Sequence, residues 1–133
     1  MSDRIYLVED DHAVLSALVA LLSLEGFAPA HFRTADEFLA AVGTLIPACV
    51  IFNVRLPGTS GIDAAAQMRT FRLDWPVVLI SGDLDCNLEV AAKEVGATYL
   101  TKPFSAEALI LAIRGAQKVR HAGLWVPTAI DPD

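Results

Sequence analysis

The sequence predicts an α/β fold: a doubly wound, parallel five-stranded sheet between two layers of helices, in a three-layer α/β/α arrangement. Short aliphatic or β-branched segments alternate with longer segments of helical periodicity, five times along the 133 residues. Four of the five short segments are nearly continuous apolar runs, which is typical of strands covered on both faces. Such a regular alternation indicates parallel strands joined by right-handed crossovers, with helices on both sides of the sheet.

The predicted strands are residues 5–8, 29–32, 48–52, 77–80 and 97–100. Between and after them, apolar residues recur at the i, i+4 and i+7 spacing of a helix face that packs on a core. The four helical patterns are Val14/Leu18/Leu21, Ala64/Met68/Phe71, Leu88/Ala92/Val95 and Leu109/Ile113/Ala116. The first of these helices also has a second apolar line, Leu15/Val19/Leu22. That line predicts either a partner surface or a two-sided fit inside the core.

A shorter helix is predicted at residues 35–42, where Thr34 and Glu37 form the pattern of a capping box. Gly26, Gly43 and Gly96 each follow a helical pattern, where a C′ glycine is expected. Five strands in this alternation favour the flavodoxin-like order 2-1-3-4-5, in which ligands bind beyond the carboxyl ends of the strands.

Composition and charge limit the class of function. The length suits one domain, and 54% hydrophobic with 20% charged residues describes a packed globular chain. A net charge of −6, with the ten basic residues scattered, argues against direct binding of nucleic acid. No apolar run approaches the ~20 residues of a membrane span, and the N-terminus lacks a signal-peptide core. Cys49 and Cys86 fit neither a disulfide framework nor a metal site, so we expect a reducing, cytoplasmic location and no contact with a membrane.

Polar residues follow four of the predicted strands at the point where each strand ends. These residues are Glu9, Asp10 and Asp11, then Asn53, then Ser81, and finally Thr101 and Lys102 before Pro103. At the carboxyl edge of a parallel sheet they should converge on one small site. The carboxylates of Asp10 and Asp11 suit Mg²⁺, which also takes waters and phosphate oxygens. The backbone carbonyl of Arg55 could supply a further oxygen. Ser81 could donate to a phosphoryl oxygen, and Lys102 could neutralise another.

Each of these residues also has an ordinary structural interpretation. An Asp-Asp pair before a helix is often only an N-cap, a serine after a strand is often a turn residue, and a Lys-Pro pair is often an exposed loop. Their joint occurrence at four strand ends favours the functional interpretation.

Four segments resemble the signature segments of two-component response-regulator receiver domains, most closely the nitrogen-fixation (FixJ-like) type. The segments are residues 7–11 (LVEDD), 53–61 (NVRLPGTSG), 78–82 (VLISG) and 96–104 (GATYLTKPF), and the similarity spans about residues 4–119. The resemblance implies the CheY-like form of the fold, with a receiver domain at residues 1–122. Residues 123–133 would then be a C-terminal tail or the start of a linker.

The resemblance also implies roles for single residues. Asp10 and Asp11 match the acidic pair that holds Mg²⁺, Ser81 matches the switch hydroxyl, and Lys102 matches the lysine that contacts the phosphate. Tyr99 matches the switch aromatic, although it could equally be an ordinary half-buried strand tyrosine. A cis peptide bond between Lys102 and Pro103 is usual in the family.

Partners follow from the same resemblance. They are a sensor histidine kinase or phosphotransfer protein, a homodimer through the face with the fourth and fifth helices, and a DNA-binding output domain outside this chain. The family role is to accept a phosphoryl group in a phosphorelay and regulate transcription, and the chain is not expected to be an enzyme in its own right.

Asn53 departs from the family pattern, because the phosphoacceptor there is an aspartate. A neutral amide is a very poor nucleophile, so we expect no phosphoryl transfer to Asn53 and a weaker Mg²⁺ site that Asn53 serves with one carbonyl oxygen. Two origins remain open: an engineered Asp→Asn change, and a natural acceptor-less receiver that acts by protein contact alone.

Two other classes share parts of the pattern. A flavodoxin-like flavin protein would need a phosphate loop rich in Gly, Ser or Thr after the first strand, where this chain has acids. A haloacid-dehalogenase-like phosphatase also uses an aspartate after a strand, but it needs a cap and a second acid late in the chain.

Overall fold

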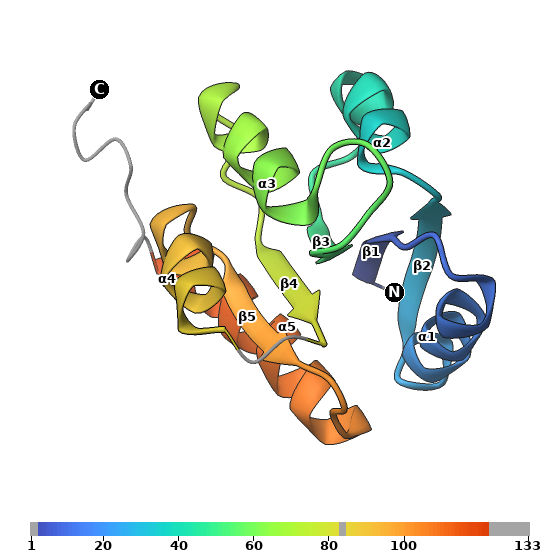
Figure 1. The fold of residues 1–133 in the computed structure, drawn as a ribbon. Helices are drawn as coiled ribbons and strands as arrows, with labels where there is room; N and C mark the ends of the chain where they lie inside the picture. Colours follow the sequence, from blue (N-terminus) through green and yellow to red (C-terminus); the bar gives the residue numbers. More distant parts are fainter. Residues whose placement is uncertain (1–2, 83–84, 123–133) are drawn as a thin grey trace.

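A computed structural model describes residues 3–82 and 85–122, which contain one parallel sheet in the order β2-β1-β3-β4-β5 (Figure 1). The strands are β1 (Asp3–Val8), β2 (Phe27–Phe32), β3 (Cys49–Asn53), β4 (Val77–Ser81) and β5 (Thr98–Thr101). The predicted fold class and strand order are confirmed. The predicted tail at residues 123–133 lies outside the described residues.

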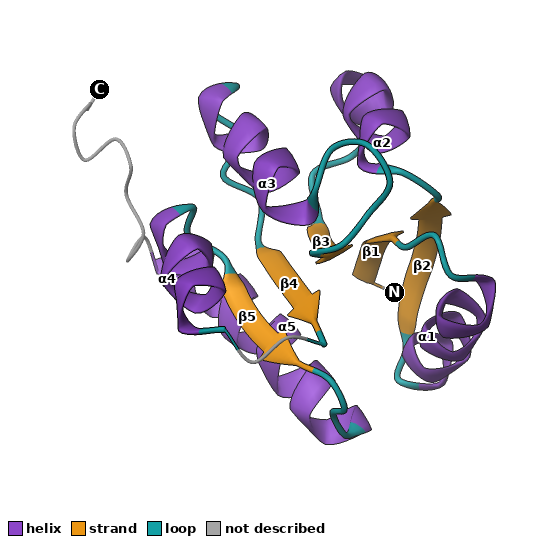
Figure 2. Ribbon diagram, in the orientation of Figure 1, coloured by secondary structure: helices purple, strands orange, loops and turns teal. Residues whose placement is uncertain are grey.

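Helices lie on both faces of the sheet (Figure 2). They are α1 (His12–Leu24), α2 (Ala35–Ala41), α3 (Gly61–Thr70), α4 (Cys86–Glu94) and α5 (Ala106–Ala122), and a 3₁₀ turn, η1 (Val42–Thr44), extends α2. Helices α2, α3 and α4 contribute to the core on one face, and α1 and α5 contribute to the core on the other. Within the described part of the chain, no helix is both long enough and apolar enough to cross a bilayer.

Alternate residues of each central strand enter opposite cores. On β1, Tyr6 and Val8 pack toward α2 and α3, whereas Ile5 and Leu7 pack toward α1 and α5. This period of two explains the continuous apolar runs, because a strand buried on both faces needs apolar residues at every position.

The two cores differ in composition. The core under α2 and α3 holds a group of aromatic rings: Tyr6 stacks on Trp75 with ring centres 6.0 Å apart, and Phe38 meets Phe52 edge-on at 5.5 Å. Aliphatic side chains dominate the opposite core, where Phe27 is the one aromatic among the described buried residues of that cluster.

The caps follow the predictions with two exceptions. Thr34 Oγ1 accepts from the Glu37 N–H at 3.0 Å, but Glu37 Oε1 accepts from the N–H of Arg33 instead of closing the box on Thr34. Gly26 and Gly96 adopt positive φ values of 92° and 69°, as expected at C′. Gly43 does follow the C-cap of α2, Val42, but its φ is not positive, because the chain continues there as the 3₁₀ turn.

The two apolar lines of α1 face the same side of the molecule. Leu15, Leu18 and Leu22 are buried. The flanking residues Val14, Val19 and Leu21 are half-buried and pack against the same core. Packing of one helix face against the sheet therefore accounts for both apolar lines, and neither line forms a separate exposed apolar surface.

Candidate functional site

Strand register brings the predicted polar residues to one edge of the sheet. Val8 pairs with Phe52, so the residues that follow them, Glu9 and Asn53, are neighbours. Asn53 pairs with Ile80, and the next residue of β4, Ser81, pairs with Thr101. Asn53 and Ser81 are the last residues of their strands, so β3 and β4 each end one residue later than the sequence predicted.

Asn53 lies at the centre of this edge and is half-buried. Its amide nitrogen Nδ2 donates to Glu9 Oε2 at 3.3 Å and to the backbone carbonyl of Arg55 at 3.0 Å. Both neighbours of the NH₂ group are acceptors, which fixes the orientation of the amide. Asn53 therefore joins the loop after β1 to the loop after β3.

Glu9 is the carboxylate that meets Asn53, although the sequence analysis placed it at the strand end without a role of its own. Its side chain is buried, and Oε2 also accepts from the N–H of Asp11 at 3.0 Å. Burial raises the pKa of the Glu9 carboxyl above its ordinary value. The Asp11 N–H and the charge of Lys102 act in the opposite direction, whereas Asp10 and Asp11 raise the pKa further. The pairing of Val8 with Phe52 is what sets Glu9, and not Asp10 or Asp11, beside Asn53.

The two residues of the predicted acidic pair, Asp10 and Asp11, have different surroundings. Asp11 is exposed and caps α1, with Oδ1 accepting from the N–H groups of Ala13 and Val14 at 2.9 and 3.1 Å. The N-cap interpretation is therefore correct for Asp11. Asp10 is exposed and borders an open hollow of about 580 Å³ together with Arg55. The other residues that line this hollow are Val54, Leu56, Pro57, Ser60, Asp85 and Leu88.

The residues from β4 and β5 lie beside this centre. Ser81 is buried, with 1% of its surface exposed, and its carbonyl accepts from the Lys102 N–H at 2.8 Å. The peptide bond between Lys102 and Pro103 is cis, as the resemblance implied. Tyr99 is half-buried on β5 and packs against the core under α3 and α4. The switch roles of Ser81 and Tyr99 and the phosphate contact of Lys102 stay predictions.

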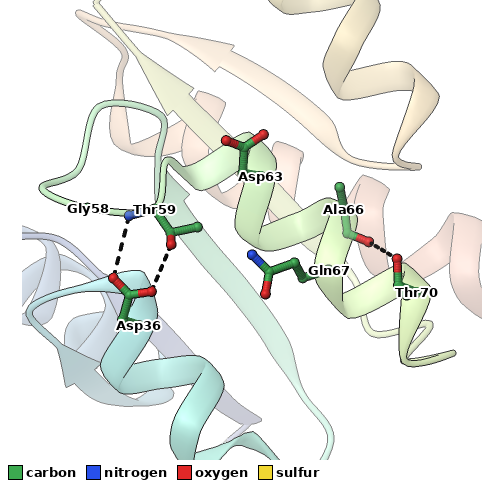
Figure 3. Close-up of a pocket in the computed structure, with 7 residues that line it drawn as sticks. All are labelled: Asp36, Gly58, Thr59, Asp63, Ala66, Gln67 and Thr70. Atoms are coloured by element: carbon green, nitrogen blue, oxygen red, sulfur yellow. Dashed lines mark hydrogen bonds between the residues drawn. The ribbon is translucent and has the colours of Figure 1, made fainter.

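The loop after β3 is anchored to α2 (Figure 3). Thr59 donates its hydroxyl to Asp36 Oδ1 at 2.7 Å, and its N–H approaches Asp36 Oδ2 at 3.5 Å. Gly58 has φ +77°, and a Cβ at that position would lie 2.7 Å from Asp36 Oδ2, so glycine is required there. These contacts border a second hollow, lined by Asp36, Gly58, Thr59, Asp63, Ala66, Gln67 and Thr70, which includes none of the predicted site residues.

Gly61 sets the other end of the same loop. A Cβ at Gly61 would collide with the backbone carbonyl oxygen of Asn53, and the Gly61 N–H donates to the Val54 carbonyl at 3.0 Å. The start of α3 thus lies directly against the end of β3, which fixes the backbone of Asn53.

The donor set, as arranged, does not fit Mg²⁺. A magnesium site needs oxygen ligands, whereas Asn53 presents its nitrogen to the Arg55 carbonyl, and Asp11 uses Oδ1 at the helix cap. Across residues 3–82 and 85–122, no three His, Cys, Asp or Glu side chains are grouped so as to share a metal ion. The metal-binding roles of Asp10, Asp11, Asn53 and Arg55 stay predictions.

Comparison with known proteins agrees with this geometry. The family model of the response regulator receiver domain matches residues 5–114. The response regulator protein TodT of Pseudomonas putida is 40% identical over 123 residues, which cover 90% of this chain and 54% of that protein. The transcriptional regulatory protein FixJ of Bradyrhizobium diazoefficiens is 35% identical over 114 residues, covering 85% of this chain and 56% of its own length. The chain thus spans about half the length of these curated relatives.

Solved structures give the same result for the fold. Full-length FixJ from B. japonicum superposes with a TM-score of 0.84 at 31% identity, over 93% of this chain and 62% of that one. The response regulator StyR superposes with a TM-score of 0.82 at 30% identity, over 92% of this chain and 63% of that one. The family model, the curated relatives and the strand order agree: the chain belongs to the response-regulator receiver domains of two-component systems.

Proposed function

We propose that this chain is a receiver domain that does not accept a phosphoryl group and that signals through contacts with other proteins. The observation that carries the proposal is the side chain of Asn53, which stands at the edge of the sheet between Glu9 and the Arg55 carbonyl. A receiver whose central residue is a hydrogen-bonded amide offers no carboxylate oxygen at that point.

The chemistry of the amide supports this proposal. The lone pair of an amide nitrogen is delocalised into its carbonyl, so the nitrogen donates hydrogen bonds and does not attack phosphorus. Both hydrogens of Asn53 Nδ2 have acceptors, Glu9 Oε2 and the Arg55 carbonyl. The carbonyl oxygen Oδ1 is neutral and would have to take on charge to form a bond. Neither atom is an activated nucleophile of the kind that covalent phosphoryl transfer needs.

Partners are proposed from the family and from the printed names of the relatives. A sensor histidine kinase or a phosphotransfer protein would dock on the receiver, and an output domain that binds DNA would lie outside this chain. The description of FixJ as a transcriptional regulatory protein supports the second part. We further propose a cytoplasmic location, a homodimer through the face of α4 and α5, no enzymatic activity of its own, and Mg²⁺ affinity below that of a receiver with aspartate at position 53.

The two origins of Asn53 predict the same chemistry. An engineered Asp→Asn change would remove the acceptor from an otherwise complete site, with Ser81 and Lys102 in place. A natural acceptor-less receiver would have lost phosphorylation and kept its protein contacts. In both cases the present chain stays unphosphorylated.

Labelling with a small phosphodonor tests the proposal. The native chain, Asn53→Asp and Asn87→Asp are incubated with radiolabelled acetyl phosphate and Mg²⁺, and covalent label is counted after removal of the donor. Only Asn53→Asp should take label. Asn87 is an exposed residue of α4, so Asn87→Asp controls for the added charge. Stable label on the native chain at any residue would contradict the proposal.

A further inference from the structure

We propose that the NH₂ group of Asn53 takes the place of a divalent cation, so that this receiver holds its carboxyl edge together without metal. The proposal extends the proposed function from phosphoryl chemistry to the conformation of the site. It rests on the placement of one donor group between two oxygens that come from different loops.

The two oxygens beside Asn53 both carry negative charge or partial negative charge. Glu9 Oε2 belongs to a carboxylate that is 4% exposed, and the Arg55 oxygen is a backbone carbonyl. The N–H groups of Asn53 supply partial positive charge to both, at 3.3 and 3.0 Å. Glu9 Oε2 also accepts from the Asp11 N–H, so Asn53 adds a second donor to a buried carboxylate oxygen, and hydrogen bonds to a charged acceptor are the stronger ones. The amide therefore does for these oxygens what a metal ion would otherwise do.

The opposite orientation of the Asn53 amide shows why its observed hydrogen bonds and a bound cation exclude each other. With Oδ1 in place of Nδ2, three oxygens would face one another: Glu9 Oε2, the Arg55 carbonyl and Asn53 Oδ1. That arrangement is repulsive unless a cation lies between them. The amide orientation with Nδ2 inward and a bound divalent ion are therefore mutually exclusive at this point of the site.

Asp at position 53 would reverse this preference. Its carboxylate has no proton to donate at neutral pH, so it would bring a second negative charge against Glu9 and face the Arg55 carbonyl oxygen. An aspartate version should be less stable than the native chain in the absence of metal, and Mg²⁺ should restore it. The native chain should respond little to Mg²⁺, because its two oxygens are already satisfied.

Thermal unfolding with and without Mg²⁺ tests this difference. The native chain, Asn53→Asp and the exposed control Asn87→Asp are melted in EDTA and in millimolar Mg²⁺. In EDTA, Asn53→Asp should melt below the native chain by roughly 5 °C, and Mg²⁺ should raise it by several degrees. The native chain and Asn87→Asp should both shift by less than about 1 °C on addition of Mg²⁺.

Nitrogen-15 NMR on the native chain gives a second readout that needs no variant to fold. The Asn53 side-chain NH₂ signals should stay in place when Mg²⁺ is added. A Mg²⁺-dependent shift of these signals, a native melting temperature that rises with Mg²⁺ as much as that of Asn53→Asp, or an Asn53→Asp variant as stable as native in EDTA would each overturn the proposal. Because no phosphodonor is present, these outcomes are separate from those of the labelling experiment.

Discussion

Two polar side chains join distant segments of this receiver, one at each edge of the sheet. At the carboxyl edge, Asn53 donates two hydrogen bonds, one of them to a carboxylate. At the opposite edge, Arg69 of α3 donates four, all to backbone carbonyls. The acceptors are Leu73 at 2.7 Å, Val95 at 2.8 Å, Trp75 at 2.9 Å and Gly96 at 3.2 Å.

The difference means that the edge around Arg69 is held in one arrangement, whereas the edge around Asn53 could change its arrangement. The Arg69 guanidinium holds the segments that lead into β4 and β5. Burial lowers its pKa to about 10, with the Asp74 charge acting in the opposite direction, so Arg69 stays positively charged at neutral pH. The four carbonyls are served by the planar donor array of one side chain, which is part of the chain and stays charged. The Asn53 amide bridges only two oxygens, which a single cation could serve instead.

The largest expected effect comes from breaking the Arg69 contacts. Arg69→Ala leaves four part-buried carbonyls without this donor, and we expect a loss of about 3 kcal/mol in the free energy of unfolding. Arg69→Lys keeps the charge without the planar donor array and should lose less. Urea denaturation measures both. A loss below that of an exposed arginine variant would show that the four hydrogen bonds stabilise little.

The next effect concerns the backbone beneath Asn53. In Gly61→Ala the new methyl group collides with the Asn53 carbonyl oxygen, so α3 must shift, at a cost of about 2 kcal/mol. Gly43→Ala is the matched control, since a Cβ there meets no atom within 4 Å. Denaturation midpoints should fall for Gly61→Ala alone. Equal midpoints for the two variants would mean that the close approach of α3 to β3 does not matter for stability.

A smaller effect, with a defined dependence on pH, is expected at Glu9. Because burial raises the pKa of Glu9 in the folded state, the protonated form is favoured there. Stability from this group is therefore present at acid pH and is lost as pH rises through the folded pKa. Glu9→Gln keeps an oxygen acceptor and removes the charge, so it should be more stable than native at neutral pH, with the gain vanishing at acid pH. Melting curves across that range would refute this if the gain grew on acidification.

The smallest effect is expected at the surface. Arg114 pairs with Asp3 at 3.1 Å and lies over the Phe27 ring at 4.8 Å, but both charged side chains are more than half exposed. Arg114→Ala should cost less than about 1 kcal/mol, and added salt should shrink the cost further. Comparison with Arg69→Ala by urea denaturation sharpens the contrast between an exposed arginine and one that joins four carbonyls.

The sequence predicted the polar residues at the carboxyl edge, around Asn53, and missed the contacts at the opposite edge, around Arg69. Polar residues at the ends of apolar strands stand out, and parallel pairing forces them together, so Asn53, Ser81 and Lys102 were found. Arg69 sits in an ordinary helical pattern, and its acceptors are loop carbonyls that have no sequence signature. Glu9 was placed at this edge but given no role for a different reason: three acids in a row suit both a helix cap and a site, and only strand register shows which one meets Asn53.

The unequal division of aromatic residues between the two cores has a practical consequence. Tyr6 and Trp75 lie in the core under α2 and α3, and Tyr99 packs against that core. Near-ultraviolet circular dichroism and intrinsic fluorescence from these three rings will thus report on one half of the molecule. Once the second tryptophan, Trp125, is replaced by phenylalanine, loosening of α1 and α5 from the other face would leave these optical signals almost unchanged. Hydrogen exchange of the amides of α1 and α5 is the measurement that would detect it.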